Sequence, residues 1–322
     1  MSPRLSAYLM LLIVSVIWGV AGPVIKFTLH DFPPLIFLSY RFAISGVIAL
    51  VYFATTKTRF PSKPKDIGLA TIYSIFAVTL ALGLLFFGFD KTTSLTGTLL
   101  SAMAPIIVVA AGAIFLKEHV TKIERAGITI AFAGTLITVA GPLFSGSSGS
   151  VLGSLEGNGL IILSIFVDAV ATLAAKVMVR DRFSPTTLTH FSFIIGFVSI
   201  FPFALMSHSW PAILQTIQKA PITAHSGIWF MAIASGTLAY SLRNRALKTI
   251  EMGETTVFSY LYPIWAAPLS IFWLGEKLTV PFIVGACIIA AGVYIAENKR
   301  RHKHSPKRAV FHARRRYGKI HT

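Results

Sequence analysis

The sequence predicts an all-α fold: a polytopic membrane helical bundle of ten transmembrane helices, arranged as two inverted five-helix repeats. Three observations predict it. Hydrophobic residues make up 54% of the 322 residues and charged residues only 13%, about half the charged share of a soluble domain. The apolar residues form runs of roughly twenty, the length of a helix that crosses a bilayer, without the alternation of a barrel strand. Similar segments also recur at one fixed offset.

Ten apolar runs follow one another, separated by short polar clusters. Backbone groups in lipid must form hydrogen bonds within their own segment, so each run is expected to be a helix. The predicted spans are residues 5–28, 34–55, 67–89, 93–116, 122–143, 159–178, 185–207, 227–247, 254–274 and 280–296.

Local signals support several of these elements in order. The first run is too long for a signal peptide, and no small-residue cleavage site follows it. The third begins after a stretch rich in Pro and Lys, and the fourth follows it after a tight turn. Thr121 with Glu124 fits a capping box before the fifth span. Ser184 before Pro185 predicts the start of the seventh.

Two parts of the chain match at a constant distance. The segment LKEHVT at 116–121 resembles LGEKLT at 274–279. Pro263 follows Pro105 by 158 residues, and the same distance separates the glycine pairs of the fifth and tenth spans. We therefore expect a first five-helix repeat at 1–143, a loop rich in Gly and Ser at 144–158, and a second repeat at 159–297. The basic segment 298–322 is predicted to be a disordered cytoplasmic tail.

The distribution of Lys and Arg predicts the orientation. With a cytoplasmic N-terminus and alternating spans, most of the 29 Lys and Arg residues fall on the cytoplasmic side. Both termini are then cytoplasmic, and five spans per copy insert the second repeat upside down relative to the first. We expect a multi-pass protein of the cell inner (plasma) membrane. The net charge of +17 is explained by topology and attraction to anionic lipid, and nucleic acid is not an expected partner.

Catalytic motifs are missing from the sequence. It contains no H-E-x-x-H, no G-x-S-x-G and no phosphate-binding glycine loop. The single cysteine, Cys287, lies among Ile and Ala in the tenth span. The sequence therefore predicts no enzyme, no cofactor and no metal site.

Asp168 is the most informative polar residue. It lies roughly 15 Å along the sixth span, at a depth where a carboxylate costs about 2.5–3.5 kcal/mol. One interpretation is that Asp168 binds a substrate amine or titrates a proton, and the second of these would couple transport to protons. The other is a structural hydrogen bond to a neighbouring helix.

Five further charges lie nearer the span ends. Lys26 and Lys176 end the first and sixth spans, and are predicted either to reach the interface or to act as gate charges. Arg41 lies roughly 10 Å into the second span, where it could pair, reach the interface or clamp a substrate carboxylate. Glu118 and Glu276 follow the fourth and ninth spans and are predicted to fix tight helix–helix turns.

The remaining candidates lie beside two prolines or within spans. Pro105 and Pro263 are near the middle of the fourth and ninth spans, and a proline there frees a carbonyl, which favours a hinge or a kink that shapes a cavity. The side chains predicted to contact a substrate are Trp18, Ser101, Tyr240, Asn244, Ser259 and Tyr260, together with Asp168. For Trp18, core packing is equally compatible with the pattern. His190 is interpreted as a core residue or a proton relay.

Several of these features together resemble a known family. They are Trp18-Gly19, Lys26, Arg41-Phe42, the two proline–glutamate–glycine units and the segment 240–247. Over residues 5–297 the chain resembles the drug/metabolite transporter superfamily, and within it the EamA-type ten-helix metabolite exporters. The resemblance implies a 5+5 inverted-repeat fold with cytoplasmic termini. It also implies export of small metabolites, often amino acids, through a cavity walled by the first, third, fourth, sixth, eighth and ninth helices. Asp168 and Arg243 depart from the family pattern.

The predicted function is a secondary transporter or facilitator that exports small metabolites, with amino acids or related compounds expected first, by alternating access through a central cavity. Its partners are a small-molecule substrate and the lipid bilayer. Export of organic cations or drugs, with Asp168 as counter-ion, is the alternative within this class. A non-transporting membrane scaffold or intramembrane enzyme is the alternative of another class.

Overall fold

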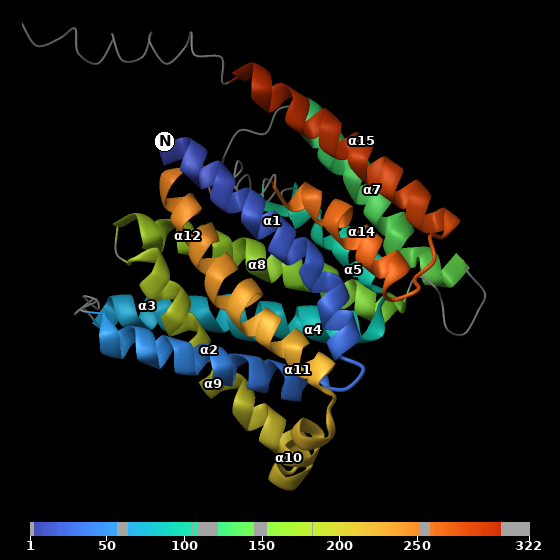
Figure 1. Cartoon of the computed structure of the whole chain (residues 1–322). Coiled ribbons are helices and arrows are strands. Elements are labelled where there is room, and N and C mark those ends of the chain that lie inside the picture. The colour runs from blue at the N-terminus through green and yellow to red at the C-terminus, as the bar shows by residue number, and fades with distance from the viewer. Residues whose placement is uncertain are drawn as a thin grey trace, which may run out of the picture.

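A computed structural model of the chain describes residues 3–56, 64–104, 106–108, 122–144, 153–181, 183–250 and 258–303 (Figure 1). All regular structure within these residues is helical. This confirms the predicted all-α membrane bundle.

The helices of the two repeats follow each other in the same order. The first repeat holds α1 (Pro3–Thr28), α2 (Pro34–Thr55), α3 (Pro64–Ser74), the π-helix η1 (Ile75–Leu80), α4 (Ala81–Lys91), α5 (Ser94–Ser101) and α7 (Lys122–Phe144). The second holds α8 (Leu155–Asp181), α9 (Pro185–Ser207), α11 (Ile222–Trp229), the π-helix η2 (Phe230–Leu238), α12 (Ala239–Thr249), the 3₁₀-helix η3 (Phe258–Leu261), α14 (Tyr262–Phe272) and α15 (Val280–Lys303). A short amphipathic helix that the sequence did not predict, α10 (Trp210–Lys219), joins α9 to α11.

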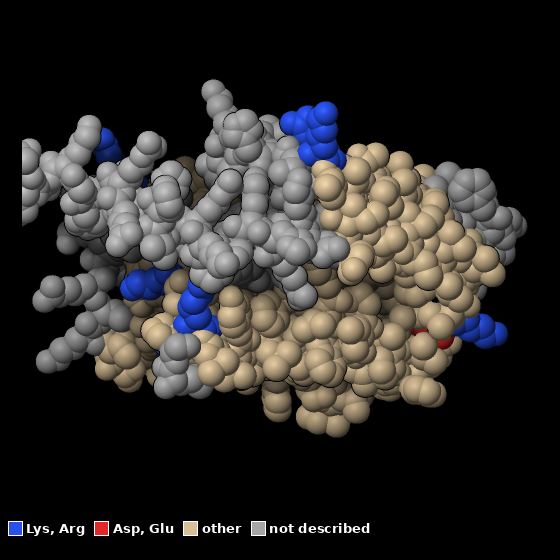
Figure 2. Space-filling view, turned by 90° about the horizontal axis from the view of Figure 1, so that it is seen from above, with Lys and Arg blue, Asp and Glu red and all other residues tan. Residues whose placement is uncertain are grey.

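Five helices are long and apolar enough to cross a membrane by length and composition. They are Pro3–Thr28, Pro34–Thr55, Pro64–Lys91, Leu155–Lys176 and Pro185–Ser207. Large apolar side chains such as Leu50, Met206 and Phe272 are exposed on the outside of the bundle. Figure 2 shows one face on which a broad area carries no charged side chain. Such an apolar exterior suits a bundle that is surrounded by lipid.

The two repeats pack as equivalent, inverted halves. The helix α2 lies against its counterpart α9, and α7 lies against its counterpart α15. Contacts between different spans are also duplicated. The helix α1 packs on α12, and its counterpart α8 packs on α4, the counterpart of α12. In Figure 1, α1 and α8 run in opposite directions, and so do α7 and α15. This is the inverted arrangement that the five-span repeat predicted.

Close packing between α7 and α15 depends on glycine. A Cβ atom on Gly292 would lie 2.4 Å from the backbone nitrogen of Ala131 and 2.6 Å from the carbonyl oxygen of Gly127. A Cβ atom on Gly134 would lie 2.8 Å from the nitrogen of Ile289. These glycines let the two backbones approach closely, as small residues do at helix interfaces in membranes.

The third helix of each repeat carries a π-helical segment at a corresponding place, η1 in one and η2 in the other. A π turn misaligns backbone hydrogen bonds and often marks a functional site. In η2, side chains bind the backbone carbonyls. Ser45 donates to the carbonyl of Ala232 at 3.2 Å, and the Trp18 indole donates to the carbonyl of Ser235 at 3.0 Å. The wide turn therefore ties α1 and α2 to the eighth span.

The fourth and ninth spans are also irregular at corresponding places. The helix α5 ends at Ser101 and a turn follows at Ala102 and Met103, while η3 precedes α14 in the ninth span. Pro263 lies in the first turn of α14, where its missing N–H removes no helical bond. Its predicted position inside a helix was therefore wrong, and a hinge there stays a prediction. Pro105 lies outside the described residues.

The last helix is longer than predicted. The helix α15 continues to Lys303, past the end at 296 that hydropathy suggested and into the segment expected to be disordered. Its final turns are rich in Lys and Arg and free of Gly and Pro.

Candidate functional site

A cavity lies between the two repeats. It has a volume of about 160 Å³. Its walls come from α1, α2, α4, α5, α8, η2, α12, η3 and α14. They include the helices that the family resemblance implied, and α2 in addition. Five predicted substrate-binding residues line the cavity: Trp18, Ser101, Asp168, Tyr240 and Ser259.

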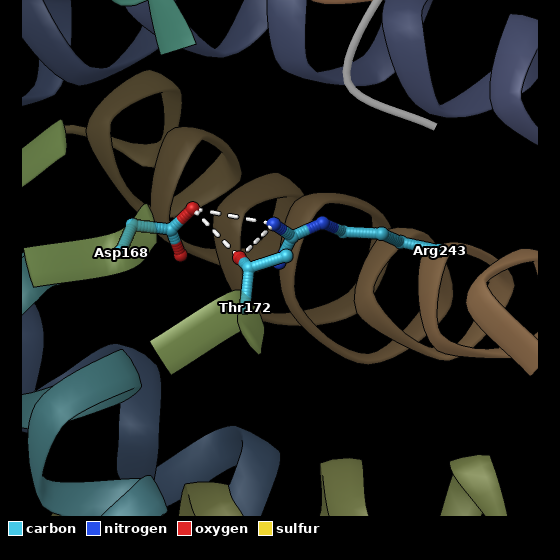
Figure 3. Close-up of polar contacts among 3 residues, drawn as sticks. All are labelled: Asp168, Thr172 and Arg243. Carbon is cyan, nitrogen blue, oxygen red and sulfur yellow. Dashed lines mark hydrogen bonds and ion pairs between the residues drawn. The ribbon is translucent and has the colours of Figure 1, made fainter. Parts of the chain in front are cut away.

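Asp168 forms an ion pair across the cavity wall. The Arg243 guanidinium Nη2 lies 3.2 Å from Asp168 Oδ2, and the same nitrogen donates a hydrogen bond to the Thr172 hydroxyl (Figure 3). Thr172 follows Asp168 by one turn of α8 and donates to its carboxylate at 3.3 Å. The three side chains therefore form a closed triangle between α8 and α12.

Aromatic side chains hold this triangle from the α1 side. The Arg243 guanidinium carbon lies 5.5 Å from the centre of the Trp18 ring, a cation–π contact. Trp18 also meets Tyr240 edge-on with 5.0 Å between ring centres. Trp18 is therefore both a packing residue and a wall of the cavity, the two roles that the sequence left open.

Arg41 lines the cavity from α2 and is 1% exposed. Its guanidinium carbon lies 5.7 Å from the ring centre of Phe42 and 5.5 Å from that of Phe86. The atoms Nε and Nη1 have no hydrogen-bond partner, and no carboxylate among the described residues pairs with Arg41. Reaching the interface, one of its predicted roles, is incompatible with this burial.

Lys26 and Lys176 occupy equivalent places in the two repeats. Lys26 donates to the carbonyls of Phe89 and Asp90, at 3.1 and 3.0 Å, where α4 ends. Lys176 donates to the carbonyls of Leu247 and Ile250, where α12 ends. Terminal carbonyls have no partner within their own helix, and a cation there also favours the helix dipole. Both lysines thus cap a neighbouring helix, and a role as gate charges or as interface anchors stays a prediction.

Glu276 binds the beginning of another helix. Its carboxylate accepts hydrogen bonds from the backbone N–H groups of Ser94, at 2.6 Å, and Leu95, at 2.8 Å. Burial raises the pKa of Glu276 above its ordinary value, while the two amides and the charge of Lys26 act against that rise. Glu276 therefore joins the turn after α14 to the N-terminus of α5. Its repeat counterpart, Glu118, lies outside the described residues.

Three other candidates lie away from the cavity. Asn244 is buried and donates to the Thr189 hydroxyl at 2.9 Å, towards α9. Tyr260 is half-buried and is not among the residues that line the cavity. His190 is buried and stacks on Tyr52 with 4.3 Å between ring centres, as a core residue would.

Sequence reasoning noted Arg243 only as a departure from the family pattern, and it missed Thr172. The structure places Arg243 in the cavity wall, bound to both Asp168 and Thr172. Two signals could have found this cluster. Charged residues of opposite sign inside spans tend to pair, and a hydroxyl four residues after Asp168 shares its helix face.

Two inverted five-helix repeats around a cavity define a multi-pass membrane protein with the architecture typical of secondary transporters. The EamA-like transporter family matches residues 5–140 and 155–297, one match in each repeat. The chain belongs to this family.

Named relatives agree with this assignment, and a solved structure has a similar fold. The uncharacterized transporter YyaM of Bacillus subtilis is 28% identical over 299 residues, which are 91% of this chain and 94% of the relative. The "Probable amino-acid metabolite efflux pump" of Salmonella typhimurium is 26% identical over 302 residues, 91% of this chain and 94% of the relative. A crystal structure of another chain is similar with a TM-score of 0.65 at 15% identity, over 93% of this chain and 99% of that one. At this identity the structural likeness speaks for the fold alone.

Proposed function

We propose that the protein is a secondary transporter or facilitator that exports small metabolites, amino acids or related compounds, by alternating access through the central cavity. One observation carries the proposal: inverted, equivalent repeats contribute residues to a single cavity between them. In such folds one repeat moves against the other around a fixed site, which opens alternately to the two faces. The printed name of the Salmonella relative supports efflux and an amino-acid-type substrate.

The proposal includes the membrane setting. We place the protein in the cell inner (plasma) membrane with both termini in the cytoplasm, because that orientation puts most Lys and Arg residues on the cytoplasmic side. A protease or a membrane-impermeant label applied to each side of sealed vesicles tests the orientation. Cleavage of the C-terminal tail from outside intact cells would contradict it.

Transport by the purified protein in liposomes tests the function. We expect counterflow of labelled small metabolites into liposomes that contain the protein, and no counterflow into liposomes without it. Two neighbouring residues of α8 provide a matched pair of variants: Ala169 lines the cavity and is 2% exposed, whereas Val170 faces outward and is 43% exposed. Ala169→Phe should block the flux by filling the cavity, and Val170→Phe should preserve it. Equal flux in both variants would show that solutes do not pass through this cavity.

Export of organic cations is the second candidate, because Asp168 lines the cavity and its side chain is 35% accessible. Competition by quaternary ammonium compounds separates the two candidates: inhibition at low concentration would favour cations. Proton coupling through Asp168 stays a prediction. If Asp168 carries the proton, a pH gradient should drive uptake in the wild-type protein but not in Asp168→Asn.

A further inference from the structure

The described part of the cavity wall carries one more positive charge than negative charge. Among the described residues that line it, the charged side chains are Arg41, Asp168 and Arg243. Asp168 balances Arg243 at 3.2 Å, which leaves the charge of Arg41 without a counter-charge. A charge enclosed by low-dielectric walls acts over the whole cavity, because little water screens it. The empty cavity is therefore electrostatically suited to a solute with one negative charge.

Arg41 is held in an unusual state for a buried arginine. Buried charges in proteins are normally paired and fully hydrogen-bonded, yet Nε and Nη1 of Arg41 have no partner. The flanking rings of Phe42 and Phe86 attract the cation but cannot accept directed hydrogen bonds from both nitrogens. The guanidinium fork matches the two oxygens of a carboxylate. A carboxylate in the cavity would supply the counter-charge that this side chain lacks, and it would accept from the two buried nitrogens once the Arg41 side chain turns toward it.

Asp168 is poorly placed to select a cation. Its carboxylate already accepts from both Arg243 and Thr172. A bound cation would compete for this carboxylate and weaken its pairing with Arg243. The Arg243 side chain is nearly inaccessible to solvent, so water would not replace the lost partner. The cation would also add a charge to a wall that is positive already. Arg41 has no anionic partner among the described residues, so an anion binds there without that loss.

The rest of the wall determines what the anion carries. The cavity is also lined by Leu82, Leu85, Phe86 and Phe89 of α4, of which Phe86 lies beside the Arg41 guanidinium. These side chains suit an apolar body of a few carbon atoms. Hydroxyls on the α5 and α14 sides, such as Ser101 and Tyr262, can bind a neutral polar group.

We infer that the cavity binds small organic monocarboxylates, anions with an apolar body, and that Arg41 is the residue that binds the carboxylate while Asp168 and Arg243 stay paired. This inference rests on the proposed transport function and narrows its substrate class. Amino acids, whose ammonium group cancels the negative charge, should bind more weakly than the matching hydroxy acids. Amines without a carboxylate should bind least.

Two matched sets of probes test the inference on the purified full-length protein. Each set keeps one carbon skeleton and changes the charge: 2-hydroxy-4-methylpentanoate, leucine and leucinol form one set, and 3-phenyllactate, phenylalanine and phenylalaninol form the other. Binding is measured by the shift in thermal unfolding temperature over a concentration series. Counterflow of the same probes is measured in liposomes. We expect the hydroxy acid to bind at least tenfold more tightly than the amino alcohol in at least one set.

Variants connect this preference to Arg41. Arg41→Met should abolish the preference for the acid. Arg245→Met, which removes an exposed arginine of the same bundle that contacts Thr186, should keep it. Because Arg41 is buried without an ion-pair partner, its replacement by an apolar side chain should not lower the unfolding temperature without ligand. If Arg41 had only a structural role, Arg41→Met would lower the unfolding temperature and keep the preference for the acid.

Four results would overturn the inference. They are equal or tighter binding of the amino alcohols, no binding of any of the six probes, an acid preference that survives in Arg41→Met, and a marked loss of thermal stability in that variant. The binding assay tests this inference, and the flux assay tests the proposed transport function, so the two can fail independently. Flux of other solutes without binding of these acids would contradict the substrate class alone. Tight binding of the acids without any flux would contradict transport and leave the site intact.

Discussion

Replacing Asp168 with Asn would remove the negative charge that lies 3.2 Å from Arg243 and change little else in shape. The attraction between unit charges at this distance is about 5 kcal/mol at an effective dielectric constant of about 20 and about 1 kcal/mol in water. The Arg243 side chain is 8% accessible and that of Asp168 is 35% accessible, so the pair lies between these limits. We expect Asp168→Asn to lower the free energy of unfolding by about 2–3 kcal/mol, because it leaves a buried arginine without its anion.

A double-mutant cycle isolates this interaction from other effects of each substitution. Arg243→Met leaves the more accessible partner unpaired and should cost less, about 1–2 kcal/mol. The double variant should be more stable than the sum of the single effects predicts, with a coupling energy of about 2 kcal/mol. Unfolding of the purified variants by titration with sodium dodecyl sulfate gives the free energies. Arg245→Met, at an exposed site of the same helix, should stay within about 0.5 kcal/mol of the wild type.

Additive single effects, within about 0.5 kcal/mol, would refute the pairing of Asp168 with Arg243 in the membrane bundle. Transport by the same four proteins tests the role of the pair in function. If Asp168 binds a substrate cation or carries a proton, Asp168→Asn should abolish flux. Unchanged flux in a folded Asp168→Asn variant would remove the carboxylate from the mechanism and leave it a structural role only.

Three further predictions concern the helix ends and the interface between repeats. Burial raises the pKa of Glu276 in the folded protein, so the folded state binds this proton more tightly than the unfolded chain does. The free energy of unfolding should therefore fall as pH rises above the ordinary pKa of 4.5. Glu276→Gln should flatten that part of the pH profile of stability, and an unchanged profile would contradict the prediction. Lys26→Met and Lys176→Met should each lower the free energy of unfolding by about 1–2 kcal/mol, since each leaves buried carbonyls at a helix end without their donor; a loss in only one of them would argue against equivalent caps. Gly292→Ala should destabilise the protein by about 1–3 kcal/mol, because the added Cβ meets the backbone of α7. Gly46→Ala is the control and should be neutral or stabilising, because Gly46 has open space around it. Similar effects of both substitutions in the same unfolding assay would contradict the close contact between α7 and α15.

Much of the fold follows from features that are local in sequence. Apolar runs of sufficient length predict helices because lipid offers no hydrogen bonds to the backbone, and the repeat predicts how the two halves correspond. The interruptions were harder to predict. Nothing in the local pattern distinguishes the π-helical turns η1 and η2 from a regular helix. The contacts that hold η2 come from side chains of other spans, Trp18 and Ser45. The short helix α10 lies in a polar connection and has too few apolar residues for a span.

The candidate site was predicted unevenly, and the reason is physical. Asp168 could be found because a carboxylate in a span is costly wherever it points. Its partner could not be chosen from the sequence alone, because the contact with Arg243 joins residues 75 positions apart. The lysines illustrate the same limit. Their position near span ends suggested the interface, but the carbonyls that they bind belong to other helices, which only the packed structure brings close.

Access to the cavity from the two faces of the membrane tests the central claim most directly. Ser101 and Ser259 are separated by the repeat distance and both line the cavity, so each can be replaced by Cys in a Cys287→Ala background that has no other thiol. Labelling by a membrane-impermeant thiol reagent is then measured in sealed vesicles of both orientations. Alternating access predicts that each cysteine reacts from both faces and that transported solute slows the reaction. Cysteines that stay unlabelled, or that react from one face only under all conditions, would contradict a cavity that opens to both sides.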